Sequence, residues 1–190
     1  MRNLSWFVFS VVLLTLPLSG QALFNKKSAD EQRQELQDSR KSALDQLYAE
    51  RPPAREVLGS AKGYAVFSSV GINVLLVSTE NGGGILHDNT TGKDTYMKMF
   101  SAGGGIGMGV KDFSLIFVFH TQEAMDSFQE SGWDFSGQAD ANAETSSQGA
   151  GAETSATVMP GTSIYKLTKA GLALQATLQG TKFWADDDLN

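Results

Sequence analysis

Apolar residues recur at helical spacing between residues 28 and 50 and would share one narrow face. Ser28 and Glu31 have the S-x-x-E spacing of a capping box, which predicts that a helix begins there. Mixed charges occupy the other faces, whereas a membrane-surface helix would be more uniformly basic. We therefore expect this helix to lie on the domain with a solvated outer face. Its apolar residues are Leu36, Ala43, Leu44, Leu47 and Tyr48.

Two shorter helices are predicted from local signals. The proline pair at residues 52–53 would end the first helix and begin a second one over residues 54–61. Thr121 is a suitable N-cap and Gly132 a suitable stop for a third helix between them.

The middle and the end of the chain have extended patterns. Residues 94–100 alternate, with Thr95, Met97 and Met99 on one face, and residues 114–119 form a continuous run typical of a strand buried on both faces. Because the helices are segregated from short strands, the sequence predicts an α+β fold with N-terminal helices and a strongly curved, barrel-like antiparallel β-sheet. Further strands are expected at residues 64–70, 72–78, 85–86, 163–167, 172–178 and 182–184, with a bend at Gly71 and turns at residues 80–84, 89–93, 169–171 and 180.

Glycine occupies every second position from residue 103 to 109. In an extended strand, one face of this stretch would be bare backbone, and glycine inside a strand marks a close approach by another element. We predict one strand here, joined across residues 111–112 to the strand at 114–119, and covered by an aromatic side chain or a crossing C-terminal segment. An open apolar cavity on this face would instead be the first candidate lipid site. The spacing matches no phosphate-binding loop, so the glycines are not expected to bind a nucleotide.

Length and charge restrict the function further. The chain has 190 residues, a formal net charge of −6 and a sequence pI near 4.9, which argues against nucleic acid as a partner. It has no cysteine, so neither disulfides nor a lipid-modified cysteine is available.

Residues 1–22 have the pattern of a signal peptide. Arg2 is followed by the apolar stretch at 6–18 and by small residues at 20 and 22, which predicts cleavage after Ala22. A retained membrane anchor is the alternative, but Pro17 interrupts the stretch, which is shorter than the ~20 residues that span a bilayer. We expect a periplasmic or secreted protein that is not a lipoprotein, with one domain over residues 23–190: a helical segment at 23–50 and a β-rich core at 54–190.

Catalytic signals are sparse. The two histidines, His87 and His120, lie at a turn and a strand end, and no G-x-S-x-G elbow accompanies them. The aspartates at 186–188 are expected to form a solvated acidic tail rather than a cation site. We therefore predict no catalytic residues, no metal and no cofactor.

Several motifs occur in a fixed order from about Asp45 to the end of the chain: AKGYAVF at residues 61–67, GGGI at 82–85, GGGIGMGV at 103–110, GW at 132–133, YKLT at 165–168, GLALQ at 171–175, and GTK at 180–182 followed by Trp184. As a set they resemble the SYLF family, also called the Ysc84 actin-binding domain family. The chain is similar to the exported bacterial branch, in which the domain stands alone after a signal peptide. The positions expected to mark the fold are Gly63, Gly103, Gly105, Gly107, Gly109, Trp133, Gly171, Gly180 and Trp184.

The resemblance implies a lipid-binding module without enzymatic activity. Eukaryotic members bind phosphoinositides or other anionic lipids and yeast relatives bind actin, but actin is not an expected partner for an exported bacterial protein. The resemblance also implies ordered strands within residues 137–161, which composition alone would assign to a linker.

Membrane contacts in this family are attributed to a basic, amphipathic N-terminal segment. Acidic residues interleave with the basic ones here, so two or three lysines would attract anionic lipid only weakly, at ~1 kcal/mol each. The positions implied for lipid binding are Phe24, Lys26, Lys27, Arg33, Arg40 and Lys41, to which Lys62 is added.

Two functions of different classes follow. The first is a lipid- or membrane-surface-binding module of the bacterial cell envelope, with lipid or an anionic membrane surface as its partner. The alternative is a structural or protein-interaction domain of the periplasm that has no lipid ligand. An enzyme would require an organised polar pocket around His87 or His120.

Overall fold

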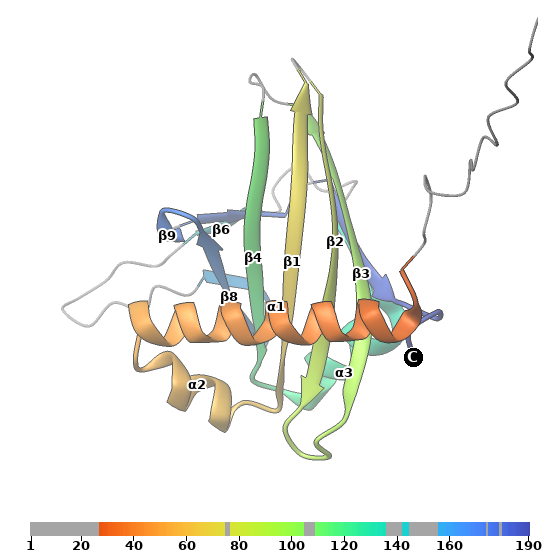
Figure 1. Ribbon diagram of the computed structural model, residues 1–190. Helices are drawn as coiled ribbons and strands as arrows, with labels where there is room; N and C mark the ends of the chain where they lie inside the picture. The colour runs from red at the N-terminus through yellow and green to blue at the C-terminus, as the bar shows by residue number, and fades with distance from the viewer. Residues whose placement is uncertain are drawn as a thin grey trace, which may run out of the picture.

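The computed structural model describes residues 27–74, 77–104, 109–135, 142–144, 156–173, 175–178 and 180–190. Helices flank a large sheet in this part of the chain, which confirms the α+β class (Figure 1). The helices are α1 (Ala29–Glu50), α2 (Ala54–Ser60) and α3 (Gln122–Ser131). The strands are β1 (Gly63–Val74), β2 (Val77–Asp88), β3 (Asp94–Gly104), β4 (Gly109–Phe119), β5 (Trp133–Asp134), β6 (Asn142–Glu144), β7 (Ala156–Met159), β8 (Thr162–Thr168), β9 (Gly171–Ala173), β10 (Gln175–Thr177) and β11 (Thr181–Ala185).

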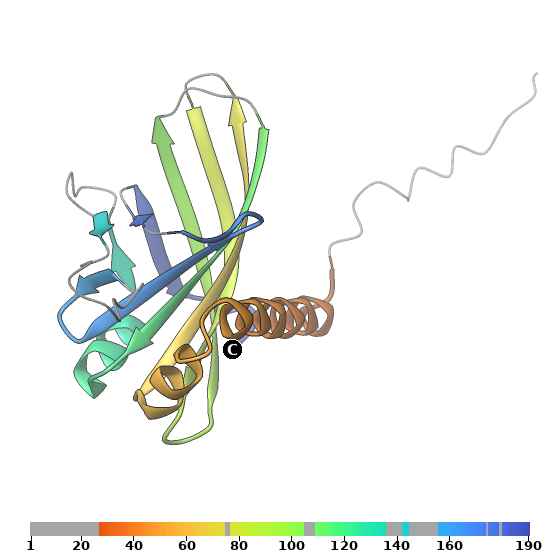
Figure 2. The ribbon, with the colours of Figure 1, turned by 90° about the vertical axis from the view of Figure 1, so that its left-hand side faces the viewer.

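The main sheet is antiparallel and strongly curved, as predicted (Figure 2). Its strand order is β5-β11-β3-β2-β1-β4-β8-β7, and β9 pairs with β8 beside this path. The four long strands at its centre place α1 and α2 on the outer, convex side and α3 on the inner side. Strands β6 and β10 form a separate pair.

Two predicted interruptions of the central strands are wrong. Gly71 pairs with both Glu80 and Lys111 inside continuous strands, so it is not a bend. Residues 80–84 lie within β2 rather than in a turn. The glycines there allow close packing: a Cβ added at Gly83 would lie 2.8 Å from Leu36 Cδ2 on α1. The run Gly-Gly-Gly therefore marks contacts from other elements.

The glycine-alternating stretch is also not one strand. β3 ends at Gly104 and β4 begins at Gly109, and these strands are separated in the sheet by β2 and β1. Residues 103–104 pair with β2, whereas Gly109 pairs with Asn73 of β1. The intervening residues 105–108 lie outside the described part of the chain, so the cover of the bare face stays a prediction.

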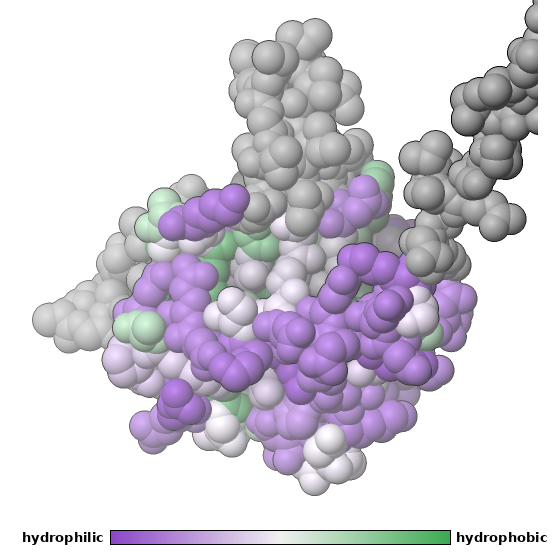
Figure 3. Space-filling view, viewed as in Figure 1, coloured by the Kyte–Doolittle hydropathy of each residue, from purple (hydrophilic) through white to green (hydrophobic). Residues whose placement is uncertain are grey.

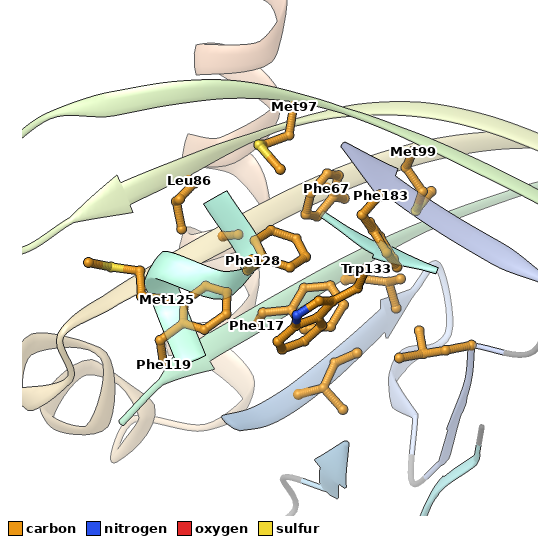
Figure 4. Close-up of a cluster of buried hydrophobic side chains, with 14 of the residues drawn as sticks. Phe67, Leu86, Met97, Met99, Phe117, Phe119, Met125, Phe128, Trp133 and Phe183 are labelled. Atoms are coloured by element: carbon orange, nitrogen blue, oxygen red, sulfur yellow. The ribbon is translucent and has the colours of Figure 1, made fainter. Parts of the chain in front are cut away.

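A cluster of aromatic and apolar side chains fills the inner side of the sheet (Figure 4). Phe128 of α3 lies at its centre, fully buried, with its ring centroid 4.8 Å from that of Trp133 and 5.5 Å from that of Phe117. Met97 and Met99 point into the same cluster, as their alternation predicted. Burial of aromatic area is the main source of stability in a chain that has no disulfides.

A second cluster on the outer side holds the helices to the sheet. Val66, Ile116 and Val118 of the central strands pack there with Tyr165 and Leu167 of β8. Their helical partners are Ala43 and Leu47 of α1 and Ala54 and Leu58 of α2.

The helix ends follow their predicted caps. Ser28 accepts a hydrogen bond from the Glu31 backbone N–H, and the Glu31 carboxylate accepts one from the Ser28 backbone N–H, which completes the capping box. Thr121 caps α3, and Gly132 follows its last residue with a φ of 65°.

The C-terminal strands agree broadly with the sequence. β8 and β11 contain the strands expected at 163–167 and 182–184, whereas residues 172–178 divide between β9 and β10. β6 and β7 lie within residues 137–161, where ordered strands were expected, and the other residues of that stretch up to 155 lie outside the described part. Gly171 and Gly180 both have positive φ, which explains glycine at these turns.

Candidate functional site

Helix α1 crosses the outer face of the sheet (Figure 2) and is attached to it by both apolar and polar groups. Of its residues, Ala43 and Leu47 are the buried ones, and both lie in its C-terminal half. Arg33 donates from Nε to the Leu189 carbonyl at 2.9 Å, and Gln46 donates to the Thr168 carbonyl at 3.1 Å. Hydrogen bonds therefore hold both halves of α1, whereas its buried apolar residues lie in the C-terminal half alone.

The central attachment of α1 is a junction around Asp94 at the start of β3, which we call the Asp94 junction. One carboxylate oxygen of Asp94 lies 2.8 Å from Arg40 Nη1 and 2.7 Å from His87 Nδ1, and the other accepts from Gln37 Nε2 at 3.0 Å. Burial raises the pKa of Asp94, but the hydrogen bonds from Gln37, His87 and Arg40 outweigh it and hold the pKa below its ordinary value. The ionised carboxylate thus ties two residues of α1 to the sheet.

A groove of about 560 Å³ lies between α1 and the outer face of the sheet. Figure 3 shows pale and green residues in the hollow above the helix, between rows of polar ones. Small residues form the floor, where Ser68 of β1 and Ser114 of β4 are paired across the strands with their hydroxyls 3.4 Å apart. Leu36, Leu167 and Leu189 add apolar walls. A volume of this size is typical of ligand-binding clefts.

The C-terminal residues form one end of this groove. Asp186 is buried, and its carboxylate lies 2.8 Å from Lys98 Nζ. Asn190 donates from its side chain to the Tyr96 carbonyl and accepts from the Tyr96 backbone N–H, so it extends the pairing of β11 along β3. The prediction of a solvated acidic tail is therefore wrong for Asp186, because Lys98, far away in the sequence, provides its counter-charge.

The described histidines do not form a serine triad. His87 bonds a carboxylate, Asp94, whereas His120 Nε2 lies 2.7 Å from the Ser163 hydroxyl. Among the described residues neither histidine bonds both a carboxylate and a hydroxyl, which a triad requires. No group of three or more potential metal-binding side chains is found in this part of the chain. The polar cluster at His87 is thus an attachment point of α1.

Most of the described members of the predicted lipid-binding set lie on α1 or just before it. Phe24 and Lys26 fall outside the described residues, and Lys62 is exposed between α2 and β1. Four others have acidic partners in the chain: Lys27 with Glu35, Arg33 with Asp30, Arg40 with Asp94, and Lys41 with Asp45. The structure does not test their role in lipid binding, which stays a prediction.

Sequence patterns missed the groove for a physical reason. Ser68 and Ser114 are 46 residues apart and meet through the pairing of β1 with β4. Gly83 was assigned to a turn, although its lack of a side chain brings Leu36 onto the sheet. The one sequence signal that could have indicated the groove was serine at outward positions of otherwise apolar strands. No helix in the described ranges combines the length and hydrophobicity needed to cross a membrane.

Comparison with known proteins gives two matches. The model of a family described as "Ysc84: Las17-binding protein actin regulator" matches residues 100–190. Beta cell expansion factor A of Aeromonas veronii is 35% identical over 167 residues, which are 88% of this chain and 62% of that protein. The chain therefore spans less than two thirds of this relative's length.

Proposed function

Residues 100–190 of this chain belong to the Ysc84 family, and from this premise we propose that the protein is a non-enzymatic module that binds lipid at a membrane surface of the cell envelope. Family membership supports an interaction module for lipid or protein, and this match is the observation that carries the proposal. The arrangement of the histidines agrees with a binding role, since neither belongs to a triad within the described residues.

The proposal includes export of the chain. Residues 1–22 would direct the protein across the inner membrane and be removed after Ala22, which leaves residues 23–190 in the periplasm or outside the cell. Mass spectrometry of the protein recovered from the periplasm and the medium tests this step, because a mature N-terminus other than Leu23 contradicts the proposed cleavage site.

The expected attraction to anionic lipid is small. Lys27, Arg33, Arg40 and Lys41 each have a carboxylate partner, so their charges are already offset within the chain. A basic residue near an anionic surface contributes ~1 kcal/mol when its charge is available. Apolar contact should therefore provide most of the membrane affinity.

Co-sedimentation with vesicles tests the proposal directly. The exported, processed protein is mixed with neutral phosphatidylcholine vesicles and with vesicles that also contain phosphatidylglycerol, both at low salt. We expect pelleting with at least the neutral vesicles. A protein that stays in the supernatant with both compositions contradicts the proposed function.

The groove favours a second candidate, a protein-interaction domain without a lipid ligand. Hydroxyl and amide groups from Ser39, Gln32 and Ser114 line it beside leucine side chains, a mixture that suits an extended peptide. A partner that remains bound to the purified protein after detergent has removed lipid would support this function. Loss of every retained protein together with the lipid would contradict it.

A further inference from the structure

We infer that Phe100 and Trp184, on the outer face of the sheet, are the residues that contact lipid, at the headgroup level of a bilayer. Phe100 is 38% exposed and Trp184 is 36% exposed, and they are the exposed large hydrophobic residues of the described chain. This inference rests on the proposed lipid-binding function and assigns it to a surface formed by β3 and β11.

The register of these two strands makes one patch of the two rings. Phe100 pairs with Lys182, and Lys98 pairs with Trp184, so aromatic and lysine side chains alternate diagonally. Their neighbours Met97, Met99 and Phe183 belong to the inner cluster, which places the four alternate residues on the outer face. Diagonal partners in an antiparallel pair are ~7–8 Å apart, within reach of aromatic rings. We call Phe100, Trp184, Lys98 and Lys182 the aromatic–lysine patch.

The charges of this patch are largely balanced. Lys98 Nζ lies 2.8 Å from Asp186 and 3.3 Å from Asp188, and Lys182 Nζ lies 2.9 Å from Asp134. Because three carboxylates lie beside the two lysine ammonium groups, the patch has no net electrostatic attraction for an anionic membrane surface. Trp184 can bind at the headgroup level through its amphipathic indole ring instead, and Phe100 adds apolar contact; neither requires anionic lipid. The patch therefore fits a neutral, zwitterionic bilayer surface.

The area and shape of the patch favour lipid over a protein partner. A stable protein interface buries about 800 Å² on each partner, far more than two partly exposed rings supply. The patch also lies on the face of the sheet opposite the inner cluster, where a bilayer can be reached without a cleft. It adjoins the start of α1, because Lys98 and Glu35 line the same groove and Glu35 pairs with Lys27. Lys27, the first residue that the structure describes, thus lies on the side of the patch.

Three variants of the exported, processed chain test this patch against the basic residues of α1. The test variant is Phe100→Ser/Trp184→Ser, and the control is Lys93→Gln/Glu123→Gln, which changes two exposed residues outside the patch and outside the predicted lipid-binding set. Lys27→Gln/Lys41→Gln removes two exposed lysines of that predicted set. With phosphatidylcholine vesicles we expect the test variant to partition about tenfold more weakly than the parent chain and the control to match the parent chain. A loss in the lysine variant as large as that in the test variant would assign the contact to α1 and overturn the inference. Raising the salt to about 0.5 M should leave the parent chain bound, since screening affects charge contacts.

Tryptophan emission of the parent chain gives a second readout, which does not depend on whether a surface variant folds. Trp133 is 8% exposed, so a blue shift on adding vesicles should come from Trp184 and disappear in Trp184→Phe, which keeps an aromatic ring and should still pellet. Thermal melting shows whether each variant is folded.

The outcomes distinguish this inference from the proposed function. If the parent chain binds vesicles but its emission does not shift, or the folded double variant binds equally well, the patch is the wrong surface and the lipid function stands. If the parent chain binds neither neutral nor anionic vesicles, both are wrong. If binding needs anionic lipid and is lost at high salt, a basic surface makes the contact and the inference is overturned.

Discussion

Replacing Asp94 by asparagine tests whether the Asp94 junction holds α1 on the sheet. The substitution keeps the shape of the side chain but removes the charge that Arg40 and His87 meet at 2.8 and 2.7 Å. The side chains of Asp94 and Arg40 are 24% and 19% exposed, so water replaces the lost contacts only in part. Hydrogen bonds to charged groups contribute about 1.5–3 kcal/mol, and asparagine can still accept one, so we expect a loss of about 2 kcal/mol.

The pH dependence of this loss follows from the direction of the pKa shift. The folded pKa of Asp94 is held below its ordinary value, so its contribution to stability is complete above the unfolded pKa of ~3.9 and is lost as the pH falls through the folded pKa. The parent chain and Asp94→Asn should therefore differ most at neutral pH. Their difference should shrink once the carboxyl is protonated in both states.

Urea unfolding at several pH values, combined with amide hydrogen exchange, is the assay. A loss of 2 kcal/mol corresponds to a lower melting temperature by about 4–8 °C in a domain of this size, and exchange should accelerate first in α1. Lys41→Gln is the control, since it removes an ion pair whose side chains are 77% and 62% exposed and should change nothing measurable. Equal stabilities of parent chain and Asp94→Asn at neutral pH, or a difference that grows in acid, would refute the reasoning.

Three further predictions concern the fold. Phe128→Ala should lower the free energy of unfolding by about 3–5 kcal/mol, because its ring is fully buried against aromatic neighbours; a loss below 1 kcal/mol by urea titration would show that the inner cluster can collapse around the cavity. Gly132→Ala should destabilise the protein by roughly 1–3 kcal/mol, because φ at residue 132 is 65° and the added Cβ would overlap the Phe183 carbonyl oxygen. Gly59→Ala in α2 should be neutral or stabilise the protein by up to ~1 kcal/mol, because no atom lies within 4 Å of the added Cβ. The reverse order of the two melting temperatures would contradict both predictions. Ser28→Ala should cost about 1 kcal/mol and speed exchange in the first turn of α1, and unchanged exchange there would argue against the capping box.

Local signals were enough to predict the helices and much of the sheet. Each helix signal acts within one helical turn, so a short sequence pattern includes all the residues that form it. These signals are the capping box of Ser28 and Glu31, the N-cap at Thr121 and the stop at Gly132. The same holds for the alternation that turned Met97 and Met99 inward. These parts of the fold depend on neighbours in the sequence.

Glycine positions were misassigned because their cause lies elsewhere in the chain. Gly83 sits in a strand under Leu36 of α1. A local pattern records the missing side chain but not the element that occupies its place, so a turn at 80–84 was the natural expectation. The buried Asp186 was missed for the same reason, since its partner Lys98 is brought near only by the pairing of β3 with β11.

The two faces of the sheet differ in what holds them together. On the inner face, aromatic rings from α3 and the strands are buried against one another, so changes there act on global stability. On the outer face, the N-terminal half of α1 is attached through Asp94 and the Leu189 carbonyl above a floor of serine and glycine. Polar attachments of this kind open at lower free energy than a packed core. Ligand binding that reorganises α1 could therefore proceed without unfolding the inner cluster, and exchange in α1 should change on vesicles while that at Phe117 and Phe128 stays constant.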